Sequence, residues 1–189
     1  MRIISGKYRG KKLFSPASDE VRPTADRARE SVFNILNGLI EDWAQVRILD
    51  VFCGTGAFGL EAISRGAASA CLLDIDTGTA LKNFKLFEGE KEKIQVVKAD
   101  VRKKLTLPSP RREYKDTLFN LVFLDAPYCQ GLSEVALQNL FAGGWIGDNA
   151  LIIVELEKNE EINLDSMLKI DDTRVYGAAK FLFLTKISS

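Results

Sequence analysis

The stretch FLDAPYCQG, residues 123–131, brings together residue types that chemistry on a small molecule requires. A run of apolar residues ends in one acid, Asp125, and Ala126, Pro127 and Tyr128 follow it directly. The carboxylate accepts hydrogen bonds, the proline fixes a turn, and the aromatic ring offers a face for stacking. The same letters also fit a strand-ending turn with an ordinary packing contact, so the rest of the chain has to decide between the two interpretations.

Acids close the other apolar runs of the chain as well. In a mainly parallel sheet the ligand lies outside the carboxyl ends of the strands, so acids at successive strand ends suggest a nucleoside-shaped ligand held by its hydroxyls and amines. Aspartate also follows strands as a turn former, but that explanation suits one position better than a whole series. The acids at the ends of the five predicted strands are Asp50, Asp74 with Asp76, Asp100, Asp125, and Glu155 with Glu157.

A glycine-rich loop follows the first of these strands. In DVFCGTGAFGLEA, Gly54, Gly56 and Gly59 precede a predicted helix, and glycines let the backbone turn tightly next to a ligand. The spacing also matches a dinucleotide-binding loop, with Asp74 about 20 residues downstream as the ribose contact. A negative Asp50 beside the loop suits the ammonium group of S-adenosylmethionine better than a pyrophosphate. The dinucleotide interpretation also leaves the DAPY stretch unexplained.

Histidine is absent from the sequence, which excludes catalytic triads, histidine metal sites and histidine bases. The cysteines Cys53, Cys71 and Cys129 form no C-x-x-C pair, so we expect reduced, partly buried thiols and no zinc site. No metal is expected. Catalysis must then rely on carboxylates, hydroxyls, amines and positioning.

Basic residues gather at the amino end, although the 26 Lys and Arg residues balance the 26 acids of the whole chain. Such an end favours an anionic partner such as a polyphosphate backbone, with a solvated, frayed terminus as the equally weighted alternative. The basic residues that precede the first acid, Asp19, are Arg2, Lys7, Arg9, Lys11 and Lys12.

The elements that hold these residues alternate apolar runs with amphipathic segments. Continuous apolar runs are typical of strands buried on both faces, and connections of this length carry helices, so we predict a mainly parallel, doubly wound α/β sheet. Helices are expected to start near Ala57, Thr77 and Ser133. The strands are predicted at 46–52, 68–76, 94–100, 118–125 and 150–157.

Both ends of the chain depart from this rhythm. Residues 1–15 are predicted to form a short hairpin around SGKYRG, and residues 171–187 an antiparallel hairpin around Gly177. Thr24 is predicted to cap a helix. The segment LTLPSPRREYKDT is expected to be an exposed loop. The apolar ends of the first hairpin are Ile3, Ile4, Leu13 and Phe14, and the stripe of the helix is Ala28, Val32, Ile35, Leu36 and Leu39.

A length of 189 residues with 46% apolar content predicts one domain over 1–189. Residues 1–23 would be its basic extension and residues 24–189 its catalytic core. No run approaches the ~18 apolar residues of a spanning helix, so we expect a soluble, cytoplasmic protein.

Three stretches beside DAPY make a specific resemblance. RIISGKYRGKKL, RPTADRARESVFNIL and GLEAISRGA, together with the glycine loop, resemble the RsmD family of S-adenosylmethionine-dependent methyltransferases acting on guanine N2 in 16S ribosomal RNA. The resemblance implies a Rossmann-like, seven-stranded class I methyltransferase fold. It also implies action on an assembled or assembling small ribosomal subunit, and a monomer is the default expectation for a small domain that docks on a large particle. Ala126 departs from the family, which usually has proline there.

The resemblance also implies roles for individual residues. Asp125, Ala126, Pro127 and Tyr128 would hold the target base, which must be unpaired to enter. Further arginines and a lysine would contact rRNA phosphates or brace the guanine pocket, with an ion pair between Arg27 and Glu30 as the alternative for Arg27. Implied cofactor contacts are Asp50, Phe52, Gly54, Thr55, Gly56, Gly59, Asp74, Ile75, Asp100 and Val101; implied RNA contacts are Arg9, Lys11, Arg22, Arg27 and Arg29.

Three other functions stay open. The chain could methylate adenine or cytosine amino groups in DNA, it could be a dinucleotide-dependent oxidoreductase, or it could be a ribosome-assembly protein without catalysis. The RPTADRARE block favours rRNA over DNA.

Overall fold

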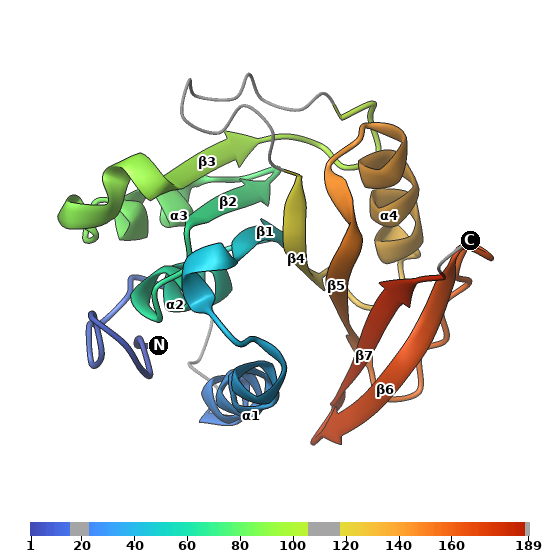
Figure 1. The fold of residues 1–189 in the computed structure, drawn as a ribbon, viewed down its shortest axis with the longest axis horizontal. Helices are drawn as coiled ribbons and strands as arrows, with labels where there is room; N and C mark the ends of the chain where they lie inside the picture. Colours follow the sequence, from blue (N-terminus) through green and yellow to red (C-terminus); the bar gives the residue numbers. More distant parts are fainter. Residues whose placement is uncertain (16–22, 106–117, 188–189) are drawn as a thin grey trace.

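The computed structural model describes residues 1–15, 23–105 and 118–187, and its centre is a seven-stranded sheet (Figure 1). The strand order is β3-β2-β1-β4-β5-β7-β6. The first five strands in this order pair in parallel, whereas β7 pairs antiparallel with both β5 and β6. The predicted α/β sheet with an antiparallel carboxyl-terminal hairpin is therefore confirmed. The strands are β1 (Arg47–Val51), β2 (Ser69–Asp74), β3 (Ile94–Lys98), β4 (Phe119–Asp125), β5 (Ile146–Glu157), β6 (Leu168–Tyr176) and β7 (Ala179–Lys186).

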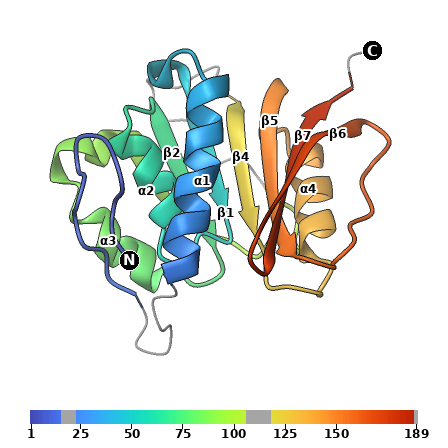
Figure 2. The same cartoon turned by 90° about the horizontal axis from the view of Figure 1, so that it is seen from below.

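Helices cover both faces of the sheet. Figure 2 shows α1 and α2 in front of it and α4 behind it. Successive strand residues belong to two separate apolar clusters, since Ile48 packs with α1 and α2 while Leu49 packs with α4. This period of two explains why the strands read as continuous apolar runs. The helices are α1 (Pro23–Leu39), α2 (Ala57–Ser64), α3 (Gly78–Phe84) and α4 (Leu132–Ala142), with short 3₁₀ turns η1 (Trp43–Gln45) and η2 (Glu88–Lys93).

Three details differ from the sequence prediction. Helix α1 begins at Pro23, so Thr24 lies inside it instead of capping it; proline suits a first helical position because its φ is already helical. Leu39 is 59% exposed at the end of α1, and Phe33 takes its place in the core. Strand β5 starts four residues earlier than predicted, and most of the predicted loop LTLPSPRREYKDT lies outside the described residues.

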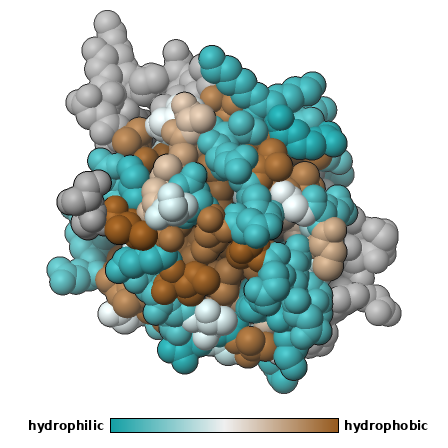
Figure 3. Space-filling view, turned by 90° about the vertical axis from the view of Figure 1, so that its right-hand side faces the viewer, coloured by the Kyte–Doolittle hydropathy of each residue, from teal (hydrophilic) through white to brown (hydrophobic). Residues whose placement is uncertain are grey.

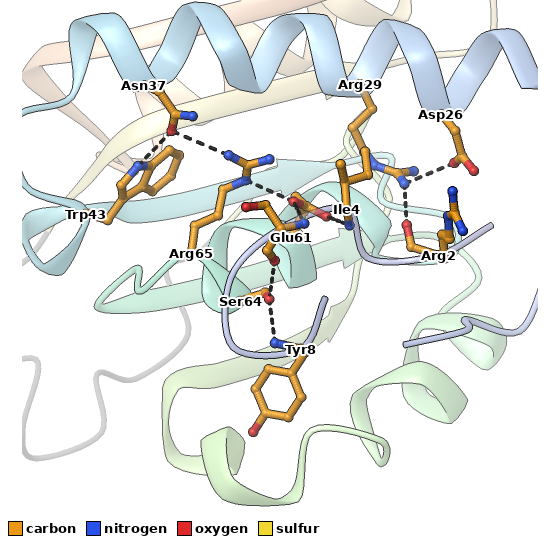
Figure 4. Close-up of polar contacts among 11 residues, drawn as sticks. Arg2, Ile4, Tyr8, Asp26, Arg29, Asn37, Trp43, Glu61, Ser64 and Arg65 are labelled. Atoms are coloured by element: carbon orange, nitrogen blue, oxygen red, sulfur yellow. Dashed lines mark hydrogen bonds and ion pairs between the residues drawn. The ribbon is translucent and has the colours of Figure 1, made fainter. Parts of the chain in front are cut away.

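Residues 1–15, here called the N-terminal arm, dock on α2 (Figure 4). The buried carboxylate of Glu61 accepts hydrogen bonds from the backbone of Ile4 and Ser5 at 2.7 and 3.0 Å, and pairs with Arg65 at 2.9 Å. Gly6 has φ +80°, and a Cβ there would lie 1.9 Å from the carbonyl oxygen of Ser64. The hairpin predicted for this segment is confirmed: Arg2 and Lys12 form an antiparallel bridge, and the backbone of Ile3 donates to the carbonyl of Lys11 and accepts from the N–H of Gly10.

The arm also reaches the glycine loop through one buried amide. Asn83 of α3 accepts a hydrogen bond from the backbone N–H of Phe14 and donates to the carbonyls of Phe14 and Thr55. Three segments that are distant in the sequence are therefore held at one point beside the carboxyl end of β1.

The opposite side of the molecule ends in the edge strand β6. Apolar and hydrophilic side chains alternate over this face in Figure 3. Met167, Ile170 and Val175 are exposed in or beside β6, and the charged pairs Lys169–Asp171 and Arg174–Asp172 lie between them. Charges on an edge strand oppose pairing with other chains. Within the described part of the chain, no helix is long and apolar enough to cross a membrane.

Candidate active site

The DAPY segment lies where β4 ends, at the carboxyl edge of the parallel strands. Asp125 is the last residue of β4, Ala126 is buried, and Pro127 and Tyr128 are exposed. The Tyr128 hydroxyl donates a 2.9 Å hydrogen bond to Glu155 Oε1 of β5. That bond fixes the aromatic ring in front of the strand ends.

Asp125 is accessible from a cavity that it lines, although protein atoms lie densely around its carboxyl group. Burial, followed by the charges of Glu155 and Asp50, raises the pKa of Asp125 well above its ordinary value. Burial likewise raises the pKa of Glu155, although the hydrogen bond from Tyr128 opposes that effect. Asp125 and Glu155 are therefore two acids that hold protons more tightly than acids in water.

The second acid of the site, Asp50, is almost completely buried at the end of β1. Its carboxylate accepts a 2.9 Å hydrogen bond from the N–H of Gly59, where a Cβ would lie 2.4 Å from a methyl group of Leu72. Burial raises the pKa of Asp50 to about 8, while the Gly59 hydrogen bond and the charge of Arg29 act in the opposite direction. Only glycine at position 59 allows α2 to approach β1 and β2 this closely.

The glycine loop is tied to β2 by Asp74. Its carboxylate accepts hydrogen bonds from the N–H groups of Gly54 at 2.8 Å and Asp76 at 2.9 Å. Phe52, at the start of the loop, has φ +61°, a conformation that non-glycine residues adopt mostly at strained functional positions.

A cavity of about 530 Å³ lies along these strand ends and brings together nine of the fourteen residues predicted to contact the cofactor or the base. Arg102, which was not predicted, also lines it and pairs in a bidentate manner with Asp100, with distances of 2.9 Å. These hydrogen bonds lower the pKa of Asp100 to about 2. The predicted residues that line the cavity are Phe52, Asp74, Ile75, Asp100, Val101, Asp125, Ala126, Pro127 and Tyr128.

A smaller cavity of about 130 Å³ continues toward α1 and shares Phe52 and Asp125 with the larger one. Asp50 and Thr55 line it as well, together with Arg29 and with Glu155, one of the acids noted at the ends of the predicted strands. Side chains along a strand alternate between the two faces of the sheet, and the residue before each of these acids packs on the α4 side. The acids themselves therefore lie on the α1 side, where the smaller cavity is. They are Asp50, Asp125 and Glu155. Gly54 and Gly56 lie in the loop and Gly59 lies inside α2, and none of the three lines either cavity.

The predicted RNA contacts divide into two groups. Arg9 and Arg27 are exposed, and Lys11 is partly buried with its ammonium 5.4 Å from the ring centre of Tyr8. Arg29 is only 8% exposed, which disfavours an outward contact with phosphates; its other predicted role, bracing the pocket, stays a prediction. The position of Arg22 lies outside the described residues.

Arg29 points from α1 toward the core (Figure 4). Its guanidinium donates to the carbonyl oxygen of Arg2 at 2.7 Å and to Asp26 at 3.0 Å. Its Nε is buried and, among the described residues, lacks a hydrogen-bond partner. The ion pair predicted as the alternative for Arg27, with Glu30, does not occur among the described residues. Arg29 and Asp26 form an ion pair in α1 instead.

Two of the three cysteines, Cys53 and Cys71, are buried, and burial raises the pKa of Cys71 to about 12. In the described ranges, no group of three His, Cys, Asp or Glu side chains is arranged to hold a metal ion.

Comparisons with known proteins agree with one another. The family described as "Conserved hypothetical protein 95" matches residues 1–185. Ribosomal RNA small subunit methyltransferase D of Escherichia coli is 40% identical over 160 residues, which is 83% of this chain and 75% of the relative. The protein of the same name from Haemophilus influenzae is 36% identical over 165 residues, covering 86% of this chain and 81% of the relative.

Among solved structures, a putative methyltransferase of Escherichia coli superposes with a TM-score of 0.77 at 33% identity. The superposition covers 100% of this chain and 99% of that one. The similarity therefore extends over both the fold and the strand ends that form the cavities.

Proposed function

The chain belongs to the RsmD family, the one described as Conserved hypothetical protein 95, and from this premise we propose that it methylates the exocyclic N2 of a guanine in small-subunit ribosomal RNA. The relatives' names support an rRNA substrate. The observation that carries the proposal is the position of Asp125, Ala126 and Tyr128 at the end of β4, on the wall of the larger cavity.

The site fits S-adenosylmethionine as the cofactor. The larger cavity has Asp74 available for ribose hydroxyls and Asp100 with Val101 for the adenine. The smaller cavity offers a buried acid, Asp50, and a buried cation, Arg29, which complement the ammonium and carboxylate groups of an amino acid. The unpartnered Nε of Arg29 supports this fit because a buried donor without an acceptor is costly. When bound, S-adenosylmethionine supplies a methyl group on a sulfonium centre.

The residues of the DAPY segment would act on the base. The lone pair of an exocyclic guanine nitrogen is delocalised into the ring, and hydrogen bonds donated by its N–H groups make the nitrogen more electron-rich. The Asp125 carboxylate and the Ala126 carbonyl are the two acceptors, and Tyr128 stacks on the base. Pro127 fixes the turn, and it also biases Ala126 toward an extended conformation, which keeps the carbonyl aimed without a second proline.

Methyl transfer would then depend mainly on positioning. The amine loses a proton, which Asp125 or water accepts. The raised pKa of Asp125 suits this step, because a carboxylate with a higher proton affinity is a better base near neutral pH.

The base must leave its helix to reach Asp125, because N2 lies on the pairing edge. Exposed basic residues of the N-terminal arm and α1, Arg9 and Arg27, would contact rRNA phosphates around it. We propose a monomer that acts in the cytoplasm on assembled or assembling small subunits.

Equilibrium titration distinguishes this function from the dinucleotide alternative. We expect S-adenosylmethionine to bind and NAD and NADP not to bind, because an ammonium group stabilises the ionised form of Asp50 whereas a pyrophosphate opposes it. Binding of NAD or NADP in preference to S-adenosylmethionine would refute the proposed cofactor and with it the reaction.

A further inference from the structure

Asp125 and Glu155 form a carboxylate pair across two neighbouring strands. The two residues are register partners in the parallel ladder of β4 and β5, so their side chains leave the sheet on the same face. Both line the smaller cavity. One surface of this cavity therefore carries two hydrogen-bond acceptors next to each other.

These acceptors are poorly supplied with donors. Glu155 Oε1 accepts the hydrogen bond from Tyr128, and no second hydrogen bond reaches Glu155 from the described residues. The carboxylate of Asp125 likewise receives none from the described part of the chain. Both carboxylates have accessible surface in the cavity, so both can accept hydrogen bonds from a ligand that brings donors.

The two acceptors lie in the same cavity as Arg29, which the proposed function assigns to the carboxylate of S-adenosylmethionine. Arg29 lines it from the opposite side, is 8% exposed, and keeps a buried Nε that has no partner among the described residues. The acceptors of β4 and β5 therefore lie beside the proposed place of the cofactor's amino-acid end, where a base that receives the methyl group has to lie.

We propose that Glu155 determines the choice of base, by accepting the N1–H of guanine while Asp125 accepts its N2–H. Guanine presents these two donors side by side on its pairing edge. Adenine and cytosine instead place a ring nitrogen lone pair beside the amine, and that lone pair would face a carboxylate. The proposal rests on the proposed function and adds the residue that selects guanine.

The bond from Tyr128 gives Glu155 a fixed orientation for this task. With Oε1 held by the hydroxyl at 2.9 Å, the second oxygen is left to face the base. The stacking ring and the selecting carboxylate are thus one unit. A Glu155→Gln variant can keep the bond from Tyr128 through its amide oxygen and present an N–H in place of the second acceptor.

The test compares two bases that carry the same amine. First, the nucleotide methylated by the wild type is mapped. Small subunits are then reconstituted with either guanosine or 2-aminopurine at that nucleotide; 2-aminopurine keeps the N2 amine, but its N1 is an acceptor. We expect the wild type to prefer guanosine by at least roughly 100-fold in kcat/KM, because a site built for a donor rejects its absence.

Glu155→Gln should lower kcat/KM on guanosine by roughly 10- to 100-fold, the loss typical of a hydrogen bond to a charged group. It should also lower the preference for guanosine over 2-aminopurine by at least about 10-fold. S-adenosylmethionine affinity, measured by calorimetry, should stay within about threefold. Glu157→Gln on the same strand is the matched control, since Glu157 lines neither cavity, and its preference should equal that of the wild type.

An unchanged preference in a folded Glu155→Gln variant would overturn the role of Glu155 alone. If the variant does not fold, the wild-type comparison still tests the inference, because equal methyl transfer to guanosine and 2-aminopurine would overturn it. Absence of N2-methylguanosine from the wild-type reaction would instead overturn the proposed function.

Discussion

At the scale of single residues, Asp50 is a buried acid whose ionisation costs stability. Its carboxyl group is 2% exposed and has a pKa of about 8, far above its ordinary 3.8. Between these two pH values the folded protein holds a proton that the unfolded chain has released. Stability therefore falls as pH rises from about 4 to about 8. An acid kept in this position is consistent with a ligand ammonium group that stabilises its charge.

Asp50→Asn is expected to stabilise the protein increasingly between pH 5 and pH 8. The gain in the free energy of unfolding over the wild type grows by at most about 1.4 kcal/mol per pH unit. In thermal unfolding, each kcal/mol should raise the melting temperature by roughly 2–4 °C. S-adenosylmethionine affinity should fall roughly 10- to 100-fold, because the ammonium loses a charged partner. Asp148→Asn, at an exposed acid paired with Lys186, should show no such gain. A gain for Asp50→Asn that does not change with pH would contradict a protonated Asp50.

Asp125→Ala should reduce methyl transfer by roughly 100-fold or more, because it removes both an acceptor for the amine and the base. S-adenosylmethionine affinity should stay nearly unchanged when measured by calorimetry. Asp172→Ala on the distant edge strand β6 is the control and should keep both properties. A large loss of cofactor affinity in Asp125→Ala would show that Asp125 holds the cofactor instead of the base.

At the scale of elements, local patterns predicted more of the fold than of the site. Apolar runs and glycine spacing predicted the strands, the glycine loop and the acids at the strand ends. The meeting of Asp125 with Glu155 depends on β4 and β5 being neighbours, and the position of Arg29 depends on α1 covering the same face. The order of the strands and the face that a helix covers cannot be predicted from the spacing of apolar residues along the sequence. The prediction that Thr24 caps the first helix was wrong, because Pro23 is already the first helical residue and proline suits that position.

The docking of the N-terminal arm on α2 is predicted to depend on Glu61. Glu61→Ala leaves the N–H groups of Ile4 and Ser5 and the guanidinium of Arg65 without their acceptor. We expect a loss of about 3–5 kcal/mol in the free energy of unfolding, as for a broken buried ion pair. The free energy of unfolding is measured by denaturant titration. The control variant Glu41→Ala, at an exposed position, should change it by less than about 0.5 kcal/mol. Similar small losses for both variants would mean that the arm docks without Glu61.

At the scale of the whole molecule, zero net charge hides an uneven distribution. The N-terminal arm and α1 carry exposed arginines on one side of the sheet, while the opposite edge at β6 mixes charges of both signs. Binding to RNA should therefore come from one region of the surface and depend on salt.

Arg9→Ala and Arg27→Ala are each expected to weaken binding to small-subunit rRNA and to reduce the slope of log K against log salt by up to about 1. Lys169→Ala on β6 should change neither quantity. Filter binding or fluorescence anisotropy over a salt series measures both. An effect of Lys169→Ala as large as that of the two arginines would place the RNA on a different face.

The most direct test of the proposed reaction is transfer of labelled methyl from S-adenosylmethionine to small ribosomal subunits from a strain lacking the modification. Naked rRNA and duplex DNA serve as parallel substrates, and nucleoside analysis identifies the product. We predict label in N2-methylguanosine of the small subunit. Label only in methylated adenine or cytosine of DNA, or no label despite bound S-adenosylmethionine, would contradict guanine-N2 methylation of rRNA.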